Sequence, residues 1–470
     1  MDTKKLRQKI LDLAIHGKLV PQDPNDEPAS VLLERIRAEK ERLISEGKIK
    51  RSRKTVKTAD MHHYEQDVPF EVPKGWVWTT LGEIAESNIG LTYKPSDICN
   101  DGVPVYRSNN IQGVKIDTTD IVRVQTTILD KQFLKEGDLL ICARNGSRRL
   151  VGKNAIIRKL TEKTAFGAFM AVCRSKYNPW LHLLLQTSYF DKYLDESNST
   201  AINQVTQSML LALNTPLPPL AEQQRIVAEI ERWFALIDTI EQGKVELQTA
   251  IKQTKSKILD LAIHGKLVPQ DPSDEPASEL LKRINPKAQI TCDNEHYPSM
   301  WHIAMLGDLF THNTGKALNS ANKEGKLKDY LTTSNVYWNR FDFSVVKQMP
   351  FKENELDKCT VVKGDLLVCE GGDVGRSAIW TYDYNICIQN HIHRLRSKEG
   401  VYTPFYYYVL KSYKDHNLIG GKGIGLLGLS SKELHKILFP VPPLAEQKRI
   451  VQKIEELFSL LDGIEQALQA

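Results

Sequence analysis

Apolar residues recur in alternating steps of four and three through the middle of the chain, from Ile226 to Leu261. Lys244 and Thr254 are the polar residues at two of these positions. A period of 3.5 residues is typical of a coiled coil, so the pattern predicts one helix from about residue 220 to residue 264, roughly 65 Å long at 1.5 Å per residue. The predicted apolar seam consists of Ile226, Ile230, Trp233, Ile237, Ile240, Leu247, Ile251, Ile258 and Leu261.

The two ends of the chain carry the same pattern and are expected to supply the partner of this helix. Residues 9–24 (KILDLAIHGKLVPQDP) recur without a change as residues 257–272, and residues 216–227 (PLPPLAEQQRIV) return as residues 440–451 (PVPPLAEQKRIV). Laid end to end, a C-terminal and an N-terminal helix rebuild the central one. The repeat is therefore circularly permuted, and it predicts antiparallel helix pairs. The C-terminal seam residues are Ile450, Ile454, Leu457 and Leu461.

Between these helices the chain has short apolar runs and turn residues that predict mixed strands and loops, and it has them twice. Trp76 and Trp301 open the two stretches, and residues 135–142 (KEGDLLIC) match residues 362–369 (VKGDLLVC). The next seven residues differ almost completely, because the first copy continues with ARNGSRR and the second with EGGDVGR. One frame with different loops is typical of two binding modules with different targets.

The pattern predicts a mixed α+β protein with two globular modules separated by a long antiparallel helical coiled-coil spacer, related by a circular pseudo-twofold repeat. The expected division is 1–69 for an N-terminal helical region with a basic linker, 70–218 for the first module, 219–296 for the central helix and spacer, 297–442 for the second module, and 443–470 for the C-terminal helix.

Composition fits a globular protein of more than one domain, with 470 residues, 26% of them charged and 41% apolar. The net charge of +5 permits a nucleic-acid partner, and it is concentrated in the modules, which carry about +3 and +4. The most basic run is residues 48–54, followed by Lys57. This run is either a solvated linker or an arm that contacts phosphates.

The cysteines and the hydropathy pattern indicate the compartment. The seven cysteines include no C-x-x-C pair, so we expect reduced thiols in a cytoplasmic protein. The N-terminus has no long apolar core, and no run approaches 18 apolar residues. The sequence therefore predicts no signal peptide and no contact with a membrane.

Motifs for catalysis are missing from the sequence. Residues 423–428 fit G-x-G-x-x-G, but no regular βαβ pattern surrounds them, so a cofactor loop is not expected. The chain has neither a phosphate-binding P-loop motif nor the Asn/Asp-Pro-Pro-aromatic motif of amino-methyltransferases. His391 and His393 flank Ile392, and a third metal ligand is not evident. We predict a protein that is not an enzyme and binds no metal or cofactor itself.

The module loops carry side chains that suit base edges and phosphates. Arg can bind guanine O6 and N7 together, Asn and Gln can do the same for adenine N6 and N7, and small turn residues let backbone amides approach phosphates. The candidates of the first module are Arg107, Asn109, Asn110, Arg144, Asn145, Arg148 and Arg149, and those of the second are Thr333, Asn335, Arg376, Gln389, Asn390, His391 and Lys422.

In these features the chain resembles the specificity subunit of type I restriction-modification systems. The resemblance spans the chain and is carried by residues 217–227 with their copy at 441–451, and by residues 17–24 with their copy at 265–272. It implies two target recognition domains, each of which reads one half of a split site in double-stranded DNA. It also implies assembly with two methyltransferase subunits that bind S-adenosylmethionine, and with restriction subunits that use ATP and Mg²⁺. The family has no motif for base-contacting residues, so the loop candidates rest on side-chain chemistry alone.

Two other classes of protein compete with this interpretation. A coiled-coil adaptor that does not bind DNA would explain the helices, but it would not explain two equal modules with unlike loops. A fused restriction-methylation enzyme would need a cofactor loop and the Asn/Asp-Pro-Pro-aromatic motif, which this sequence does not have.

Overall fold

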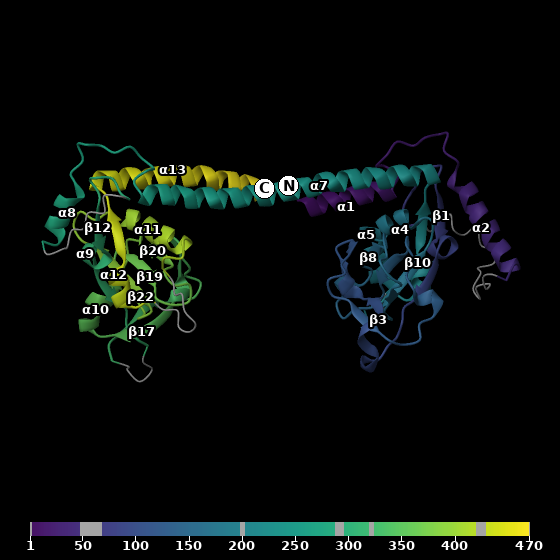
Figure 1. Cartoon of the computed structure of the whole chain (residues 1–470), viewed down its shortest axis with the longest axis horizontal. Helices are drawn as coiled ribbons and strands as arrows, with labels where there is room; N and C mark the ends of the chain where they lie inside the picture. The colour runs from purple at the N-terminus through teal and green to yellow at the C-terminus, as the bar shows by residue number, and fades with distance from the viewer. Residues whose placement is uncertain are drawn as a thin grey trace. The chain divides into compact units, whose positions relative to one another are not determined.

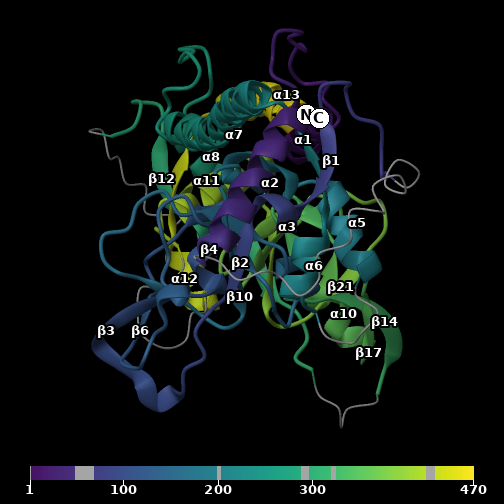
Figure 2. The same ribbon diagram turned by 90° about the vertical axis from the view of Figure 1, so that its right-hand side faces the viewer.

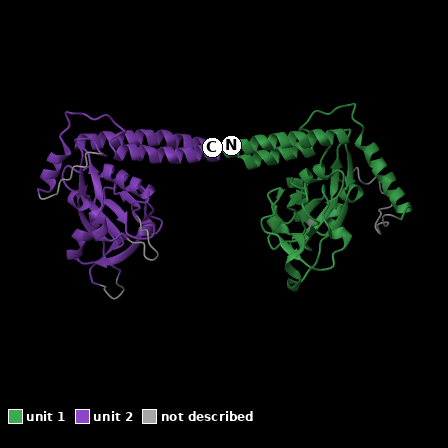
Figure 3. Cartoon of the chain, in the orientation of Figure 1, with its two compact units in different colours: residues 1–242 green, residues 243–470 purple. Residues whose placement is uncertain are grey.

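The computed structural model describes residues 2–47, 68–197, 203–286, 296–318, 324–419 and 429–469 (Figure 1). They form two compact units, residues 1–242 and 243–470, and the boundary falls inside helix α7 (Leu220–Ile263) (Figure 3). The expected division into five parts places its boundaries elsewhere and stays a prediction.

Unit 1 consists of short strands and helices together with α1 and the first part of α7. Its helices are α1 (Thr3–Ile15), α2 (Ala29–Ser45), α3 (Leu81–Ile84), α4 (Asn178–Leu184), α5 (Ser188–Ser197) and α6 (Gln207–Ala212). Its strands are β1 (Val77–Thr80), β2 (Glu86–Ile89), β3 (Ile98–Tyr106), β4 (Ile111–Gln112), β5 (Lys115–Ile116), β6 (Val122–Val124), β7 (Leu139–Cys142), β8 (Asn154–Ile156), β9 (Ala165–Phe166), β10 (Met170–Arg174) and β11 (Asn214–Leu217).

Unit 2 has the same plan, with the second part of α7 in the place of α1. Its other helices are α8 (Ala277–Ile284), α9 (Leu306–Leu309), α10 (Glu353–Cys359), α11 (Thr403–Asp415), α12 (Ser431–Lys436) and α13 (Leu444–Gln469). Its strands are β12 (His302–Met305), β13 (Phe310–Thr314), β14 (Lys326–Leu331), β15 (Val336–Tyr337), β16 (Arg340–Phe341), β17 (Lys347–Phe351), β18 (Thr360–Val361), β19 (Leu366–Cys369), β20 (Ser377–Ile379), β21 (Ile386–Ile388), β22 (Ile392–Ser397) and β23 (Leu438–Val441).

The sheets of the two units have corresponding strand orders, and the smaller sheet of unit 2 has one additional strand. A four-stranded antiparallel sheet has the order β2-β10-β7-β8 in unit 1 and β13-β22-β19-β20 in unit 2. A smaller sheet has the order β6-β3-β9 in unit 1, and its counterpart in unit 2 is β17-β14-β21-β18. Strands β3 and β6 lie at the end of unit 1 away from α1 (Figures 1 and 2). The expected mixed α+β class is confirmed.

The apolar strand that both modules share is buried on both faces. In β7, Leu139 and Ile141 pack with the core that includes α1 and α7, whereas Leu140 and Cys142 belong to a second core on the other face. Successive side chains of a strand point to opposite faces, so a strand between two cores needs an unbroken apolar run. Strand β19 is buried on both faces in the same way.

The turn that follows the repeated helix needs a glycine. Gly17 ends α1 with a φ of +64°, a conformation that L side chains rarely adopt, and a Cβ there would lie 2.3 Å from Pro73 Cγ. Gly265 ends α7 with a φ of +66°, and its Cβ would lie 2.4 Å from Pro298 Cγ. Glycine is therefore needed at both positions, for its backbone conformation and for close packing.

A buried carboxylate joins the two repeated motifs in unit 1. Glu222, in the first turn of α7, accepts hydrogen bonds from Trp76 Nε1 (2.9 Å) and Gln22 Nε2 (2.6 Å). Burial raises the pKa of Glu222, and these hydrogen bonds oppose that effect. One turn farther on, Arg225 pairs with the nearly buried carboxylate of Asp26 (2.6 Å). The start of α7 is therefore fixed to the segment that follows α1.

The same contacts recur in unit 2. Glu446 accepts hydrogen bonds from Trp301 Nε1 (2.8 Å) and Gln270 Nε2 (2.5 Å), and Arg449 pairs with Asp274 (2.6 Å). Each motif thus recurs in the sequence because each unit needs one copy of both. The motif at 216–227 and its copy at 440–451 provide the carboxylate and the arginine. The segment after the repeated N-terminal helix provides the glutamine and the aspartate, and the tryptophan opens each module.

Ion pairs show that each helix pair is antiparallel, as expected. In unit 1, Arg7 of α1 pairs with Asp238 (2.5 Å) and Glu241 (3.3 Å) of α7, at the opposite end of the pair from Gln22 and Glu222. In unit 2, Lys255 of α7 pairs with Asp462 (2.5 Å) and Glu465 (3.4 Å) of α13. The buried seam residues are Ile226, Ile230, Ile237, Ile251, Ile258, Ile450 and Ile454, and the half-buried ones are Trp233, Ile240, Leu261, Leu457 and Leu461.

The prediction was wrong for Leu247, whose side chain is 40% exposed. Lys255 lies opposite Asp462 and Glu465 in the antiparallel pair, so a residue opposite Leu247 would have to lie beyond Gln469, where α13 ends. Thr254, the polar position two turns farther on, is also exposed. A heptad pattern therefore gave the helix correctly, but it did not show where its partner ends.

Candidate nucleic-acid interface

Three loops of unit 1 meet at one end of the β2-β10-β7-β8 sheet. They are residues 107–110, 143–149 and 167–169, which we call the three-loop end of unit 1. The amide of Gly167 donates to the carbonyl of Tyr106 (2.9 Å), that of Ala143 donates to the carbonyl of Phe169 (2.9 Å), and Asn145 Nδ2 donates to Ser108 Oγ (3.3 Å). These bonds hold the loops in one surface, although they are far apart in the sequence.

The side chains predicted for this surface differ in exposure and in whether they form ion pairs. Arg144 and Arg149 are exposed, as is the amide side chain of Asn109. Arg107 pairs with Asp120 (3.2 Å), and Arg148 pairs with Asp195 (2.5 Å). The paired guanidiniums are oriented by their acidic partners but remain part-exposed, so both kinds of arginine can meet a phosphate or a base edge. Asn145 is half-buried and bonded to Ser108, as described above.

The three-loop end of unit 2 consists of residues 332–335, 370–376 and 389–391. The amide of Gln389 donates to the carbonyl of Leu331 (3.0 Å), and Arg376 Nη2 donates to the carbonyl of Thr333 (2.5 Å). The guanidinium of Arg376 also lies 4.8 Å from the ring centroid of Tyr337. The structure thus brings Thr333, Arg376, Gln389, Asn390 and His391 together. Lys422 and the basic run at 48–54 lie outside the described residues.

Asn110 and Asn335 were predicted to read bases, and this prediction was wrong. Asn110 is 1% exposed, and its Oδ1 accepts the amide of Arg107 (2.8 Å). Its Nδ2 donates to the carbonyls of Asp117 (3.0 Å) and Asp120 (2.8 Å). The side chain of Asn335 makes the same three kinds of bond within its own loop. Both amides are used inside the fold to shape the first loop of each three-loop end.

Unit 2 contains a chain of three histidines. His393 Nε2 lies 2.7 Å from the carbonyl of Leu429, His312 Nε2 lies 2.9 Å from His393 Nδ1, and His435 Nε2 lies 2.7 Å from His312 Nδ1. A carbonyl only accepts, so in the neutral chain each Nε2 carries the hydrogen and donates. Among the described residues, no group of three His, Cys, Asp or Glu side chains is arranged to hold a metal ion.

The comparisons with known proteins decide the family. Residues 73–249 and 298–470 match the family described as the type I restriction modification DNA specificity domain. The chain belongs to this family. It is a DNA specificity subunit of a type I restriction-modification system, the non-catalytic component of such an enzyme, and it has two target recognition domains. The matched stretches include the globular, strand-containing part of each unit, and we use the name target recognition domain for that part below.

Relatives in the family cover most of the chain. The type I restriction enzyme EcoAI specificity subunit of Escherichia coli is 29% identical over 97% of this chain and 88% of its own length. The EcoKI specificity subunit of E. coli strain K12 is 25% identical over 84% of each chain. The solved HsdS subunit from Thermoanaerobacter tengcongensis has a TM-score of 0.55 at 18% identity, over 85% of this chain and 93% of that one, and so shares the fold.

The sequence did not single out Phe169 in the first target recognition domain. This residue is 61% exposed at the three-loop end, beside Arg144. The signal that points to it is its place in the repeat. Met170 pairs with Cys142 at the start of β10, as Ile392 pairs with Cys369 at the start of β22, so Phe169 corresponds to the predicted residue His391.

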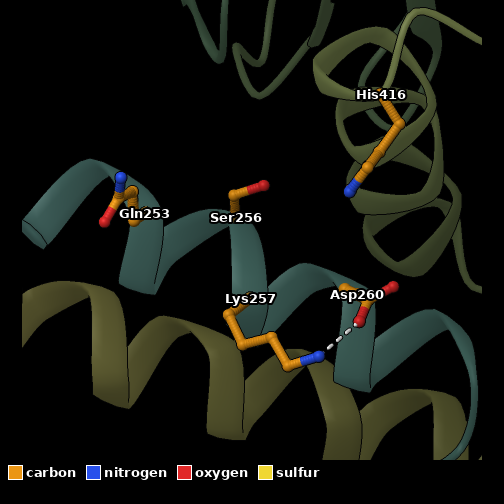
Figure 4. Close-up of a pocket in the computed structure, with 5 residues that line it drawn as sticks. All are labelled: Gln253, Ser256, Lys257, Asp260 and His416. Atoms are coloured by element: carbon orange, nitrogen blue, oxygen red, sulfur yellow. Dashed lines mark hydrogen bonds and ion pairs between the residues drawn. The ribbon is translucent and has the colours of Figure 1, made fainter.

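A polar hollow of about 320 Å³ lies elsewhere, between α7 and the end of α11 in unit 2 (Figure 4). Gln253, Ser256, Lys257 and Asp260 line it from α7, and His416 lines it from the end of α11. Lys257 pairs with Asp260 (2.9 Å) and helps to lower the pKa of that carboxyl. These residues belong to none of the recognition loops.

No helix in the described ranges is both long and apolar enough to cross a bilayer.

Proposed function

We propose that each target recognition domain reads one half of a bipartite site in double-stranded DNA with its three-loop end. The observation that carries this proposal is the contrast between a duplicated frame and unlike loops. The sheets, the buried asparagines and the carboxylate contacts recur in both units, whereas the exposed residues at the two three-loop ends differ in type and charge. Different exposed residues on a shared frame are expected when the surface that carries them sets specificity.

The chemistry that follows DNA binding belongs to partner subunits in this proposal. Two methyltransferase subunits with S-adenosylmethionine would methylate an adenine in each half-site, and restriction subunits with ATP and Mg²⁺ would cleave unmethylated DNA. Membership of the type I specificity family supports this assignment. A solved chain of the same fold (TM-score 0.58, 18% identity) comes from a study of complex assembly in the type I R-M system.

The antiparallel helix pairs would set the distance between the half-sites. Both domains are fixed to these helices by the buried carboxylates of Glu222 and Glu446, so the helices are suited to act as a ruler. Domains that read one face of a duplex bind half-sites about one helical turn apart, roughly 34 Å or 10 base pairs between centres.

Mapping of methylated adenines by single-molecule sequencing tests the proposal. A host that carries the gene with its partner genes should show one bipartite methylated motif, and deletion of this gene alone should abolish methylation at that motif. Methylation that persists after the deletion, or a continuous motif in place of two separated halves, would refute the proposal.

A further inference from the structure

An aromatic side chain is presented rigidly at the three-loop end of unit 1. Phe169 is 61% exposed, although its backbone is fixed on both sides. Its carbonyl accepts the amides of Ala143 (2.9 Å) and Arg144 (3.0 Å), and the next amide, that of Met170, donates to the carbonyl of Gly167 (2.8 Å). An exposed phenyl ring on a fixed backbone keeps apolar surface in water and loses little further freedom on binding, so it is suited to a preformed contact.

The neighbours of this ring restrict the kind of contact it can make. The guanidinium of Arg144 lies over the ring, 5.6 Å from its centroid. A ring that inserts between base steps places its faces against the neighbouring bases. With the guanidinium over one face, Phe169 offers an edge and one face, which suits a contact at the surface of a groove.

The major groove offers one apolar group for such a contact, the 5-methyl group of thymine. The remaining base-edge groups there are hydrogen-bond donors and acceptors, and a phenyl ring satisfies none of them. An arginine beside the ring fits the same surface, because it can bind guanine or a phosphate next to the thymine.

We propose that Phe169 packs against the 5-methyl group of a thymine in the half-site that the first target recognition domain reads, with Arg144 beside it. This inference rests on the proposed function and names one determinant of specificity within it.

The second target recognition domain differs at the corresponding position. The carbonyl of His391 accepts the amide of Glu370 (3.0 Å), as that of Phe169 accepts the amide of Ala143 (2.9 Å). Its imidazole lies 3.3 Å from the Glu370 carboxylate and offers polar nitrogens in place of an apolar ring. The contact with a thymine methyl is therefore assigned to the first half-site.

Removal of single methyl groups from the DNA tests this inference. The full chain, in complex with its methyltransferase subunits, is bound to duplexes that carry the mapped site, and each thymine of the first half-site is replaced in turn by deoxyuridine. One replacement should weaken wild-type binding about fourfold, as expected for one buried methyl group. The Phe169→Ala variant should bind the thymine site about as weakly and should be indifferent to that replacement.

Two further variants complete the test. Phe169→Leu keeps apolar bulk and should retain part of the methyl effect. Ile98→Ala removes an apolar side chain that is also exposed (50%), at the opposite end of β3 from Tyr106, and it should keep the wild-type profile. Wild-type binding that is indifferent to every deoxyuridine, or a Phe169→Ala variant that keeps the full methyl effect, would overturn the inference. Failure of the wild-type complex to bind any bipartite site would instead refute the proposed function.

Discussion

Neighbouring residues of the same type have different roles at the three-loop end of unit 1. Asn109 and Asn110 both follow Arg107 in a loop, and sequence chemistry gives them the same capacity to bind adenine. Asn110 turns inward, where its amide bonds to the backbone of its own loop, and Asn109 is exposed. The exposed residue therefore remains a candidate for DNA contact, and the buried one is structural.

Alanine substitutions separate the two roles. Asn110→Ala removes three part-buried hydrogen bonds to backbone groups and should reduce the free energy of unfolding by about 1–3 kcal/mol. Asn109→Ala should change it by less than about 0.5 kcal/mol and should weaken DNA binding instead. Urea denaturation and binding assays on both variants measure these effects. The assignment fails if Asn109→Ala is the more destabilising of the two.

Sequence reasoning could not separate these residues, for a physical reason. Residue type gives the hydrogen bonds that a side chain can make, whereas burial depends on how the backbone turns in a loop without periodicity. Phe169 was missed for the complementary reason. An apolar residue next to a strand is expected in a core, and only the fold shows that this one is exposed.

The histidine chain gives unit 2 a dependence on pH. Burial, and then the neighbouring His393, His435 and Arg394, lower the pKa of His312 from 6.5 to about 4. The folded chain therefore resists a proton that the unfolded chain accepts. The contribution of this site to the free energy of unfolding is fully present above pH 6.5 and is lost as the pH falls toward 4.

Ser87 of β2 lies opposite Cys173 of β10, as His312 of β13 lies opposite Leu395, the same position of β22. His312→Ser is therefore the matched change. The variant should lose less stability than the wild type between pH 6.5 and pH 4. Thermal melts across this range measure the difference, since each kcal/mol shifts the Tm of a domain of this size by about 2–4 °C. Parallel pH profiles for the two proteins would show that His312 has no part in the acid sensitivity.

At the scale of elements, the helix pairs were the most predictable part of the fold. The heptad spacing predicted α7, and the exact repeat predicted that the termini pair with it, because both signals are carried by regular spacing. Short strands such as β4 and β15, two residues each, have too few residues for a period to be read. The end of the seam at Leu247 depends on the partner helix, which the pattern of α7 does not contain.

Adjacent residues of α7 test the packing of the pair. Ile237 is fully buried, and Leu236 beside it is 46% exposed. Ile237→Ala should reduce the free energy of unfolding of the isolated chain by about 2–4 kcal/mol, because it leaves a cavity between the helices and the core. Leu236→Ala should cost less than about 0.5 kcal/mol by urea denaturation. Equal effects of the two changes would contradict the seam.

At the scale of the whole molecule, the positive charge is concentrated in the recognition domains. These domains carry about +3 and +4, and the rest of the chain carries about −2, which gives the net charge of +5. Phosphate neutralisation releases counterions, so DNA binding by the complex with its methyltransferase should weaken by at least about tenfold between 50 and 200 mM salt. Titrations at several salt concentrations measure the slope. Affinity that does not change with salt would exclude a phosphate-dominated interface.

In the proposed function, each target recognition domain reads one half-site, and the helix pairs set the distance between the half-sites. An exchange of residues 70–215 for the equivalent domain of a relative changes the first target recognition domain and leaves the helices and the second domain as they are. An insertion of four residues after Gly243 adds about 6 Å of helix and leaves both readers unchanged. Gly243 suits the insertion because no other residue packs within 4 Å of the position that a Cβ would take there.

The methylated motif of each variant, mapped in the host genome, is the most direct measurement. The domain exchange should replace one half of the motif and preserve the other half and the gap. The insertion should lengthen the gap or abolish methylation, with the bases of both half-sites unchanged. An exchange that alters both halves, or an insertion that changes the bases of a half-site, would show that the domains and the helices do not have these separate roles.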